Sequence, residues 1–276
     1  CTQREQAMRR EFAILAILGS LLLAGCSQLE RLTLIRPSAQ HRGYTQIAPR
    51  YDFSGKHGRD TGDAAMLLAA GSMFFQRGQL DEAEEQARKA LKAQPGSGDA
   101  NTLLGLIADA RGDAAGAGLL FRSVADAAPA NGVYANNYGA WLCANGRAAE
   151  SLDWFDRALA DPAYRTPVRA LANAGDCARK AGQPVRAEAS WRAALALDAT
   201  HPQALAGMAA MAFAQGEYLE ARAFVERWLA VAPDEPAALQ LAMQVEEKRG
   251  DNVAASRYRS RLQAISPGPT TAPRTQ

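Results

Sequence analysis

Histidine and cysteine are the residue types that most often carry chemistry at neutral pH, and this chain has few of either. Its 276 residues include three histidines and four cysteines. None of His41, His57 and His201 has Cys, Asp or Glu at the spacing of a metal site. The sequence also lacks a nucleophile-elbow pattern, a phosphate-binding loop and a dinucleotide fingerprint. We therefore expect no enzyme activity, no cofactor and no bound metal.

Cys26 is the cysteine whose surroundings indicate a modification. Met8-Arg9-Arg10 is followed by 13 apolar or small residues, 12–24. A membrane-spanning helix needs about 20 such residues, so this run predicts a secretory signal peptide over 1–25, with Met8 as its expected start. Its end, Leu23-Ala24-Gly25-Cys26, resembles a bacterial lipoprotein signal.

That resemblance implies that Cys26 becomes the N-terminus and carries acyl chains such as palmitate. Several buried chains, at about 0.8 kcal/mol per methylene, anchor a protein permanently. The alternative is an ordinary cleavage site beside a chance cysteine. Ser27 follows, where Gram-negative lipoproteins of the inner membrane usually have Asp. We therefore expect a lipid anchor on the periplasmic face of the outer membrane of a Gram-negative bacterium.

The next segment, residues 26–62, is interrupted by proline and glycine and is predicted to be a lipidated tether. As a flexible coil it would span roughly 30–35 Å. Over the whole chain, 31 Lys and Arg balance 29 Asp and Glu, and no basic cluster stands out. We therefore exclude nucleic acid as a partner and expect no small-molecule substrate.

Regularly spaced glycines indicate the architecture of the rest of the chain. Six of them recur at a nearly constant interval of about 34 residues, which is the period of the tetratricopeptide repeat (TPR). We predict an all-α superhelical solenoid of six helix-turn-helix repeats over 63–269, followed by a disordered tail at 270–276. The glycines are Gly78, Gly112, Gly146, Gly182, Gly216 and Gly250.

Other positions follow the same period. A small residue lies five positions after each glycine, and in the middle repeats a bulky residue follows four positions later, as in Phe121 and Trp191. Small residues allow two helices to approach, and the bulky residue fills the space beside them. The sixth repeat has Glu246 and Arg259 at core-like positions, as expected of a capping repeat with a solvated outer face.

Cys143 and Cys177 are one repeat period apart, each in the first helix of its repeat. The first helices of successive repeats are neighbours in such a stack, so we predict a disulfide between repeats three and four. Closing a loop of this size stabilises a protein by about 3–4 kcal/mol when the bond is unstrained. Two free, buried cysteines in adjacent helices are the alternative.

Certain positions of the first helix line the concave groove of TPR proteins, and these predict where a partner binds. In the first repeat they include Leu68, Ser72 and Phe75, which places apolar side chains in the groove. The second repeat adds Leu106 and the fourth presents charged residues, Arg169 among them. The alternative is that Leu68 and Phe75 are covered by the tether or by the next repeat.

Three segments of the third and fourth repeats are distinctive: residues 136–143 (Asn-Asn-Tyr-Gly-Ala-Trp-Leu-Cys), 162–167 (Pro-Ala-Tyr-Arg-Thr-Pro) and 173–177 (Asn-Ala-Gly-Asp-Cys). They resemble the central repeats of the PilF/PilW family of type IV pilus biogenesis and stability proteins. From these segments we add Asn136 and Asn173 to the partner-binding residues. The resemblance extends from Cys26 to about Pro267.

The resemblance implies an outer-membrane lipoprotein with six TPR units that acts as a pilotin. Such an adaptor helps the pilus secretin, its protein partner, to reach the outer membrane and to multimerise, which supports twitching motility. Two alternatives stay open on the sequence. One is a TPR lipoprotein that scaffolds cell-wall enzymes or another envelope complex, and the other is an envelope enzyme whose site escapes sequence inspection.

Overall fold

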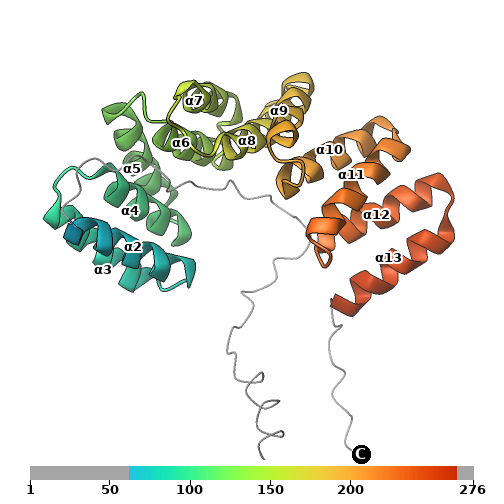
Figure 1. Cartoon of the computed structure of the whole chain (residues 1–276), viewed down its shortest axis with the longest axis horizontal. Helices are drawn as coiled ribbons and strands as arrows, with labels where there is room; N and C mark the ends of the chain where they lie inside the picture. Colours follow the sequence, from blue (N-terminus) through green and yellow to red (C-terminus); the bar gives the residue numbers. More distant parts are fainter. Residues whose placement is uncertain (1–61, 266–276) are drawn as a thin grey trace, which may run out of the picture. The chain divides into compact units, whose positions relative to one another are not determined.

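The computed structural model describes residues 62–265, so the predicted signal peptide, tether and tail lie outside the described residues. The described part contains twelve α-helices and no strand, which confirms the predicted all-α TPR solenoid (Figure 1). The helices are α2 (Gly62–Gln76), α3 (Leu80–Ala93), α4 (Gly98–Ala110), α5 (Ala114–Ala127), α6 (Gly132–Ala144), α7 (Ala148–Ala160), α8 (Pro167–Lys180), α9 (Pro184–Leu197), α10 (Pro202–Gln215), α11 (Tyr218–Val231), α12 (Pro236–Arg249) and α13 (Asn252–Ile265).

Each repeat is one antiparallel pair, from α2 with α3 to α12 with α13, and the pairs follow one another in chain order (Figure 1). The second helix of a pair also packs against the first helix of the next pair. The main contacts between the described helices are therefore local in sequence, as expected of a solenoid in which each repeat touches its neighbours.

The six predicted glycines lie in the turns between paired helices, and all have positive φ. Gly216 and Gly250, for example, end α10 and α12 in the left-handed conformation, with φ of 81° and 80°. A residue with a Cβ is strained there. The repeat period therefore marks the places where the backbone must reverse.

Helix starts are also specified by local chemistry. The side chain of Asp113 accepts a hydrogen bond from the Gly116 amide at 2.9 Å, and Ser97 accepts one from the Ala100 amide at 3.2 Å. Four helices, α8, α9, α10 and α12, begin with proline, whose missing N–H costs nothing in the first turn.

The apolar core runs between the helices. One cluster of buried side chains extends from α6 to α12, and a separate cluster joins the first two repeats. Bulky residues at the repeated position, including Phe121, Phe155 and Trp191, are almost fully buried, as the spacing predicts.

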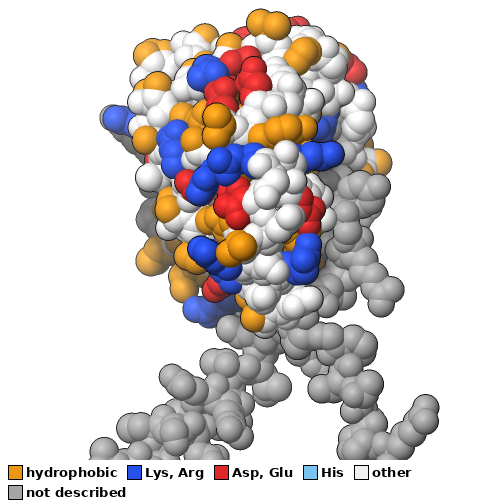
Figure 2. Space-filling view, turned by 90° about the vertical axis from the view of Figure 1, so that its right-hand side faces the viewer, with side chains coloured by type: hydrophobic (Ala, Val, Ile, Leu, Met, Phe, Trp, Pro, Cys, Tyr) orange, Lys and Arg blue, Asp and Glu red, His pale blue; other side chains and the backbone are white. Residues whose placement is uncertain are grey.

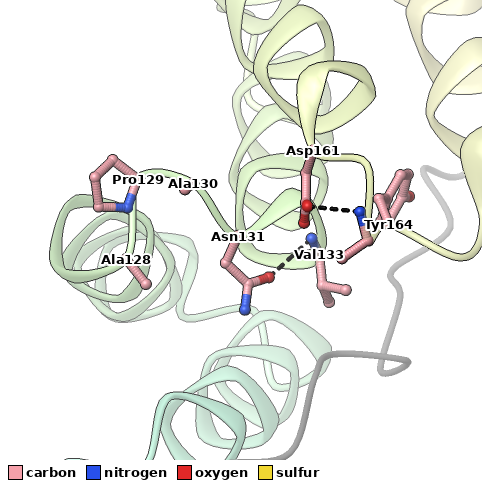
Figure 3. Close-up of a pocket in the computed structure, with 8 residues that line it drawn as sticks. Ala128, Pro129, Ala130, Asn131, Val133, Asp161 and Tyr164 are labelled. Atoms are coloured by element: carbon pink, nitrogen blue, oxygen red, sulfur yellow. Dashed lines mark hydrogen bonds between the residues drawn. The ribbon is translucent and has the colours of Figure 1, made fainter.

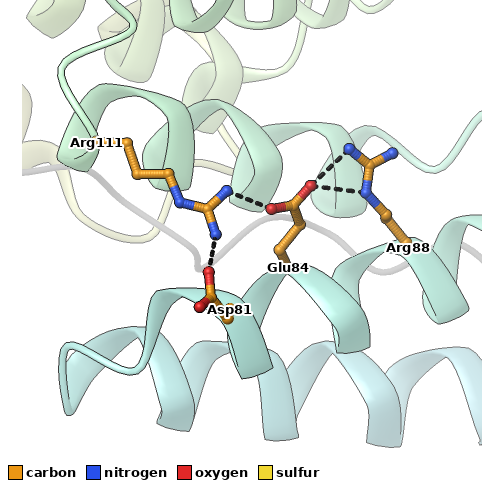
Figure 4. Close-up of polar contacts among 4 residues, drawn as sticks. All are labelled: Asp81, Glu84, Arg88 and Arg111. Atoms are coloured by element: carbon orange, nitrogen blue, oxygen red, sulfur yellow. Dashed lines mark hydrogen bonds and ion pairs between the residues drawn. The ribbon is translucent and has the colours of Figure 1, made fainter.

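An ion-pair network joins the surfaces of the first two repeats (Figure 4). Arg111, at the end of α4, donates hydrogen bonds to Asp81 and Glu84 of α3, and Glu84 also accepts one from Arg88 at 2.7 Å. Hydrogen bonds from Arg111 and then Arg88 lower the pKa of Glu84. Because Asp81 and Arg88 are solvent-exposed and Arg111 is partly so, the network adds little to stability.

The sixth repeat departs from the prediction at one residue. Glu246 does not lie on a solvated face but is buried, with carboxylate oxygens 3.1 Å from the Arg222 guanidinium and 2.5 Å from that of Arg249. The guanidinium groups of the two arginines compensate the negative charge of the Glu246 carboxylate, which would otherwise be costly to bury. Arg259 is exposed, as expected of a capping repeat, and pairs with Glu247.

Candidate partner-binding surface

The first helices of successive repeats lie side by side: α6 contacts α8, α8 contacts α10, and α10 contacts α12. This row of first helices is the surface on which TPR arrays present side chains to other proteins. All seven partner-binding residues predicted from the sequence belong to first helices.

The predicted apolar contact at the first repeat is not an open surface. Leu68 is only 8% exposed and lies in the apolar cluster with Leu103 of α4, and Leu106 is 2% exposed. Phe75 is half-buried between the clusters of the first and second repeats. The prediction of exposed leucines is therefore wrong, because the next helix pair packs over these positions. Ser72 is half-buried and donates a hydrogen bond to the Leu68 carbonyl at 2.8 Å.

The structure brings together the two predicted asparagines, which are far apart in the sequence. The amide nitrogen of Asn173 in α8 donates to the side-chain oxygen of Asn136 in α6 at 3.2 Å. Gln203 of α10 donates in turn to the side-chain oxygen of Asn173, also at 3.2 Å. These three buried amides form a chain of hydrogen bonds across the first helices of repeats three, four and five, which we call the amide ladder.

Asp176 of α8 is a further hydrogen-bond partner of the amide ladder. Its carboxylate accepts hydrogen bonds from the Gln203 amide at 2.9 Å and from the Trp191 indole at 3.1 Å. Burial raises the pKa of Asp176 to about 6, against the lowering effects of Gln203, Arg179 and Trp191. The carboxylate is therefore held by neutral donors in a site that disfavours its charge.

Gln203 is the member of the ladder that the sequence analysis missed. It lies one repeat period after Arg169, a predicted groove residue, so the same period applied to the fifth repeat would have identified it. Arg169 itself is half-buried, whereas Arg179 and Lys180 at the end of α8 are exposed. The fourth repeat therefore presents cations beside the buried polar ladder.

A disulfide lies in the same two helices as the asparagines. The sulfur atoms of Cys143 in α6 and Cys177 in α8 are bonded, and their Cα atoms are 5.7 Å apart. Both residues are buried in the cluster that also contains Trp191. The bond therefore holds together the two helices from which the ladder begins.

A cavity of about 390 Å³ lies at the loops that precede α6 and α8 (Figure 3). Asn131 accepts hydrogen bonds from the Val133 and Tyr134 amides, and Asp161 accepts them from the Gly132 and Ala163 amides. The polar groups of Asn131 and Asp161 are thus used to hold the loops in place. The remaining lining of the cavity is mainly apolar. Its lining consists of Ala128, Pro129, Ala130, Asn131, Val133, Asp161, Ala163 and Tyr164.

Within residues 62–265, no group of three or more His, Cys, Asp or Glu side chains is placed to hold a metal ion. Across the same described range, no helix is both long and apolar enough to cross a membrane. Over the described residues, the first helices of repeats three to six pack side by side, and the buried amide ladder joins three of them.

Comparisons with known proteins agree with the fold. Tetratricopeptide repeat family models match residues 63–132 and 178–244. The type IV pilus assembly protein PilF of Pseudomonas aeruginosa is 26% identical over 212 residues, covering 76% of this chain and 83% of the relative.

Solved structures give the same result. PilW, a widely conserved type IV pilus biogenesis factor, superposes with a TM-score of 0.69 at 27% identity over 76% of this chain and 96% of the other. The structure of P. aeruginosa PilF has a TM-score of 0.68 at 24% identity, over 75% and 93% of the two chains.

Proposed function

Because this chain is a TPR protein of the PilF/PilW family, we propose that it is a non-catalytic adaptor for type IV pilus biogenesis. In this proposal it acts as a pilotin, a lipid-anchored outer-membrane protein that helps the pilus secretin to reach that membrane and to multimerise. The observation that carries the proposal is a shared architecture along nearly the full length of PilW, together with sequence similarity to PilF.

The arrangement of the helices supports an adaptor role. The first helices of repeats three to six pack in a row, and the buried amide ladder links those of repeats three, four and five. Because these amides are buried and hydrogen-bonded to one another, they fix how the helices stack and leave partner contacts to the exposed residues around them. The disulfide between α6 and α8 keeps this part of the row in a fixed arrangement.

The lipid anchor is assigned to Cys26 and the outer-membrane destination to Ser27, both from the sequence. We propose that the anchor brings the repeats to the membrane in which the secretin ring assembles. Membrane attachment and partner binding then act together, since confinement to one membrane raises the effective concentration of the two proteins.

Two substitutions at one position test the proposal. Ser27→Asp retains the lipidated cysteine but, by the lipoprotein sorting pattern, redirects the protein to the inner membrane. We expect secretin multimers in the outer-membrane fraction to fall to the level of a deletion strain, as seen on gels of unboiled samples. Ser27→Ala is the matched control and should preserve the multimers.

Cys26→Ala should also prevent multimer assembly and should abolish incorporation of labelled palmitate. Normal secretin multimers in a strain that lacks this protein would refute the pilotin assignment. Loss of cell-wall enzyme complexes with intact secretin multimers would support a scaffold function instead.

A further inference from the structure

Three exposed apolar residues recur at one position of the last three repeats. Val185, Leu219 and Val253 are separated by one repeat period each, and each lies three positions after the glycine of its turn. They lie in the first turns of α9, α11 and α13 and are 82%, 72% and 64% exposed. We call these three residues the edge row, since they follow the turns between paired helices.

The edge row is confined to repeats four to six. The same position holds Asp81, Ala115 and Ala149 in the first three repeats. Single exposed apolar side chains are ordinary on a protein surface. Three at one repeat position are different, because the stacking of the repeats sets them in register along one edge.

A hollow lies beside the middle member of the edge row. It has a volume of about 530 Å³ and is lined by residues 216–220 together with Arg249, so it lies between the turns of repeats five and six. Figure 2, which views the molecule from the side of the last repeats, shows separate apolar side chains interspersed with charged ones. The hollow is shallow and open to solvent, and Leu219 forms part of its lining, so an apolar side chain of a partner can contact Leu219 there.

The charge around the hollow is acidic. Glu217 and Glu220 line it, and the carboxylate of Glu220, through hydrogen bonding, raises the pKa of Glu217. Arg192 pairs with both Glu188 and Glu220, and Arg249 is held by Glu246 at 2.5 Å. Arg192 thus pairs with two carboxylates, and Glu217 places a third beside them, which leaves an excess of negative charge next to Leu219.

We propose that the edge row and its hollow form a second docking surface, which takes a polypeptide segment of another protein that combines apolar residues with a Lys or Arg. The apolar side chains of this segment contact Val185, Leu219 and Val253, and its cation lies between Glu217 and Glu220. The complementary charge identifies the partner as basic, because a cation relieves the repulsion between these carboxylates.

This surface is separate from the amide ladder. The ladder residues belong to the first helices α6, α8 and α10, with Trp191 behind them, whereas the edge row belongs to the second helices α9, α11 and α13. The edge row is therefore exposed where the ladder is buried, and the inference does not rest on the proposed pilotin function.

Photo-crosslinking in cells that produce the full chain tests the inference. A photo-reactive amino acid is placed at Leu219 and, in a separate strain, at Leu119 of α5, which is equally exposed at 73% but lies outside the edge row. We expect an adduct with another protein from position 219 and at least about tenfold less from position 119. Mass spectrometry should map the linked peptide to a segment with apolar residues and a Lys or Arg.

Substitutions in the proposed docking surface provide a second test, in which the yield of the adduct from position 219 is measured. Glu217→Lys combined with Glu220→Lys should reduce the adduct by about fivefold or more, because each reversal replaces an attraction to the partner's cation with a repulsion. Val185→Ser with Val253→Ser should also reduce it, whereas Leu197→Ser with Val231→Ser, two exposed apolar residues outside the edge row, should not. Unchanged circular dichroism melts would show that the variants remain folded.

Several outcomes would overturn the inference. These are equal yields from the two positions, an adduct mapped to an acidic segment, an adduct with a second copy of this chain, or a yield that resists charge reversal.

Discussion

Asp176 is the residue whose environment is most unusual for its type. Its carboxylate is buried against Gln203 and Trp191, and its pKa is raised from 3.8 to about 6. A raised pKa means that the folded state binds the proton more tightly than the unfolded state does. The resulting stabilisation is complete below about pH 4 and is lost as the pH rises through about 6.

Replacing Asp176 with asparagine should remove this pH dependence. When the pH rises from 4.5 to 6.5, loss of the proton from Asp176 should lower the free energy of unfolding by about 2 kcal/mol. The Asp176→Asn protein should lack this decrease. Urea unfolding at both pH values, with the two proteins compared at each, isolates the effect from other carboxylates. Parallel pH profiles for the two proteins would contradict the assignment.

The sequence predicts only part of the amide ladder. The sequence segments identify Asn136 and Asn173, but not their pairing with each other or with Gln203. Hydrogen bonds between successive repeats depend on how one helix pair is rotated against the next. That rotation follows from the sum of many packing contacts and not from any single spacing.

At the scale of the elements, α8 and α10 approach closely over the ring of Trp191 from α9. A Cβ added at Gly175 would lie 2.4 Å from the indole, and one added at Gly207 would lie 2.3 Å from it. Contacts this short require the ring or a helix to move. The glycines of α8 and α10 therefore make room for the bulky residue of the repeat.

Gly207→Ala should therefore destabilise the protein by about 1–2 kcal/mol. Overpacking costs about 1–3 kcal/mol, which is partly offset by the higher helix propensity of alanine. Urea unfolding followed by the helical circular dichroism signal measures the loss. The cost should shrink in a Trp191→Phe background, where the second ring of the indole is absent. An equal cost in both backgrounds would mean that the indole does not set the spacing.

At the scale of the whole molecule, packing is local along the chain. Repeats contact their neighbours: one apolar cluster joins the first two repeats, another joins repeats two and three, and a third extends over repeats three to six. In such an array, stability is approximately a sum of repeat and interface contributions. A destabilising substitution in the last repeats should therefore loosen the last repeats and leave the first repeats unchanged.

Leu239→Ala in α12 tests this. Leu239 is fully buried in the cluster of repeats three to six, so its truncation should cost about 2–5 kcal/mol. Hydrogen exchange should accelerate in α10 to α13 and stay unchanged in α2 to α5. A uniform increase along all twelve described helices would show instead that the array unfolds as one unit.

The sequence by itself determined the repeat architecture of this protein. Glycines one period apart require turns, and the small and bulky residues between them specify which helix faces meet, so each repeat is encoded within a single period. The family resemblance also followed from short segments, and similarity to PilF and PilW supports it. These features are local, and local spacing is what a sequence displays directly.

Only the tertiary structure decided which groove positions are accessible and which polar groups meet. Leu68 and Leu106 occupy groove positions of their helices but are covered by neighbouring repeats, and Gln203 reaches Asp176 from the next repeat. The physical reason is that exposure is set by neighbours distant in sequence, whose stacking angle no single repeat encodes.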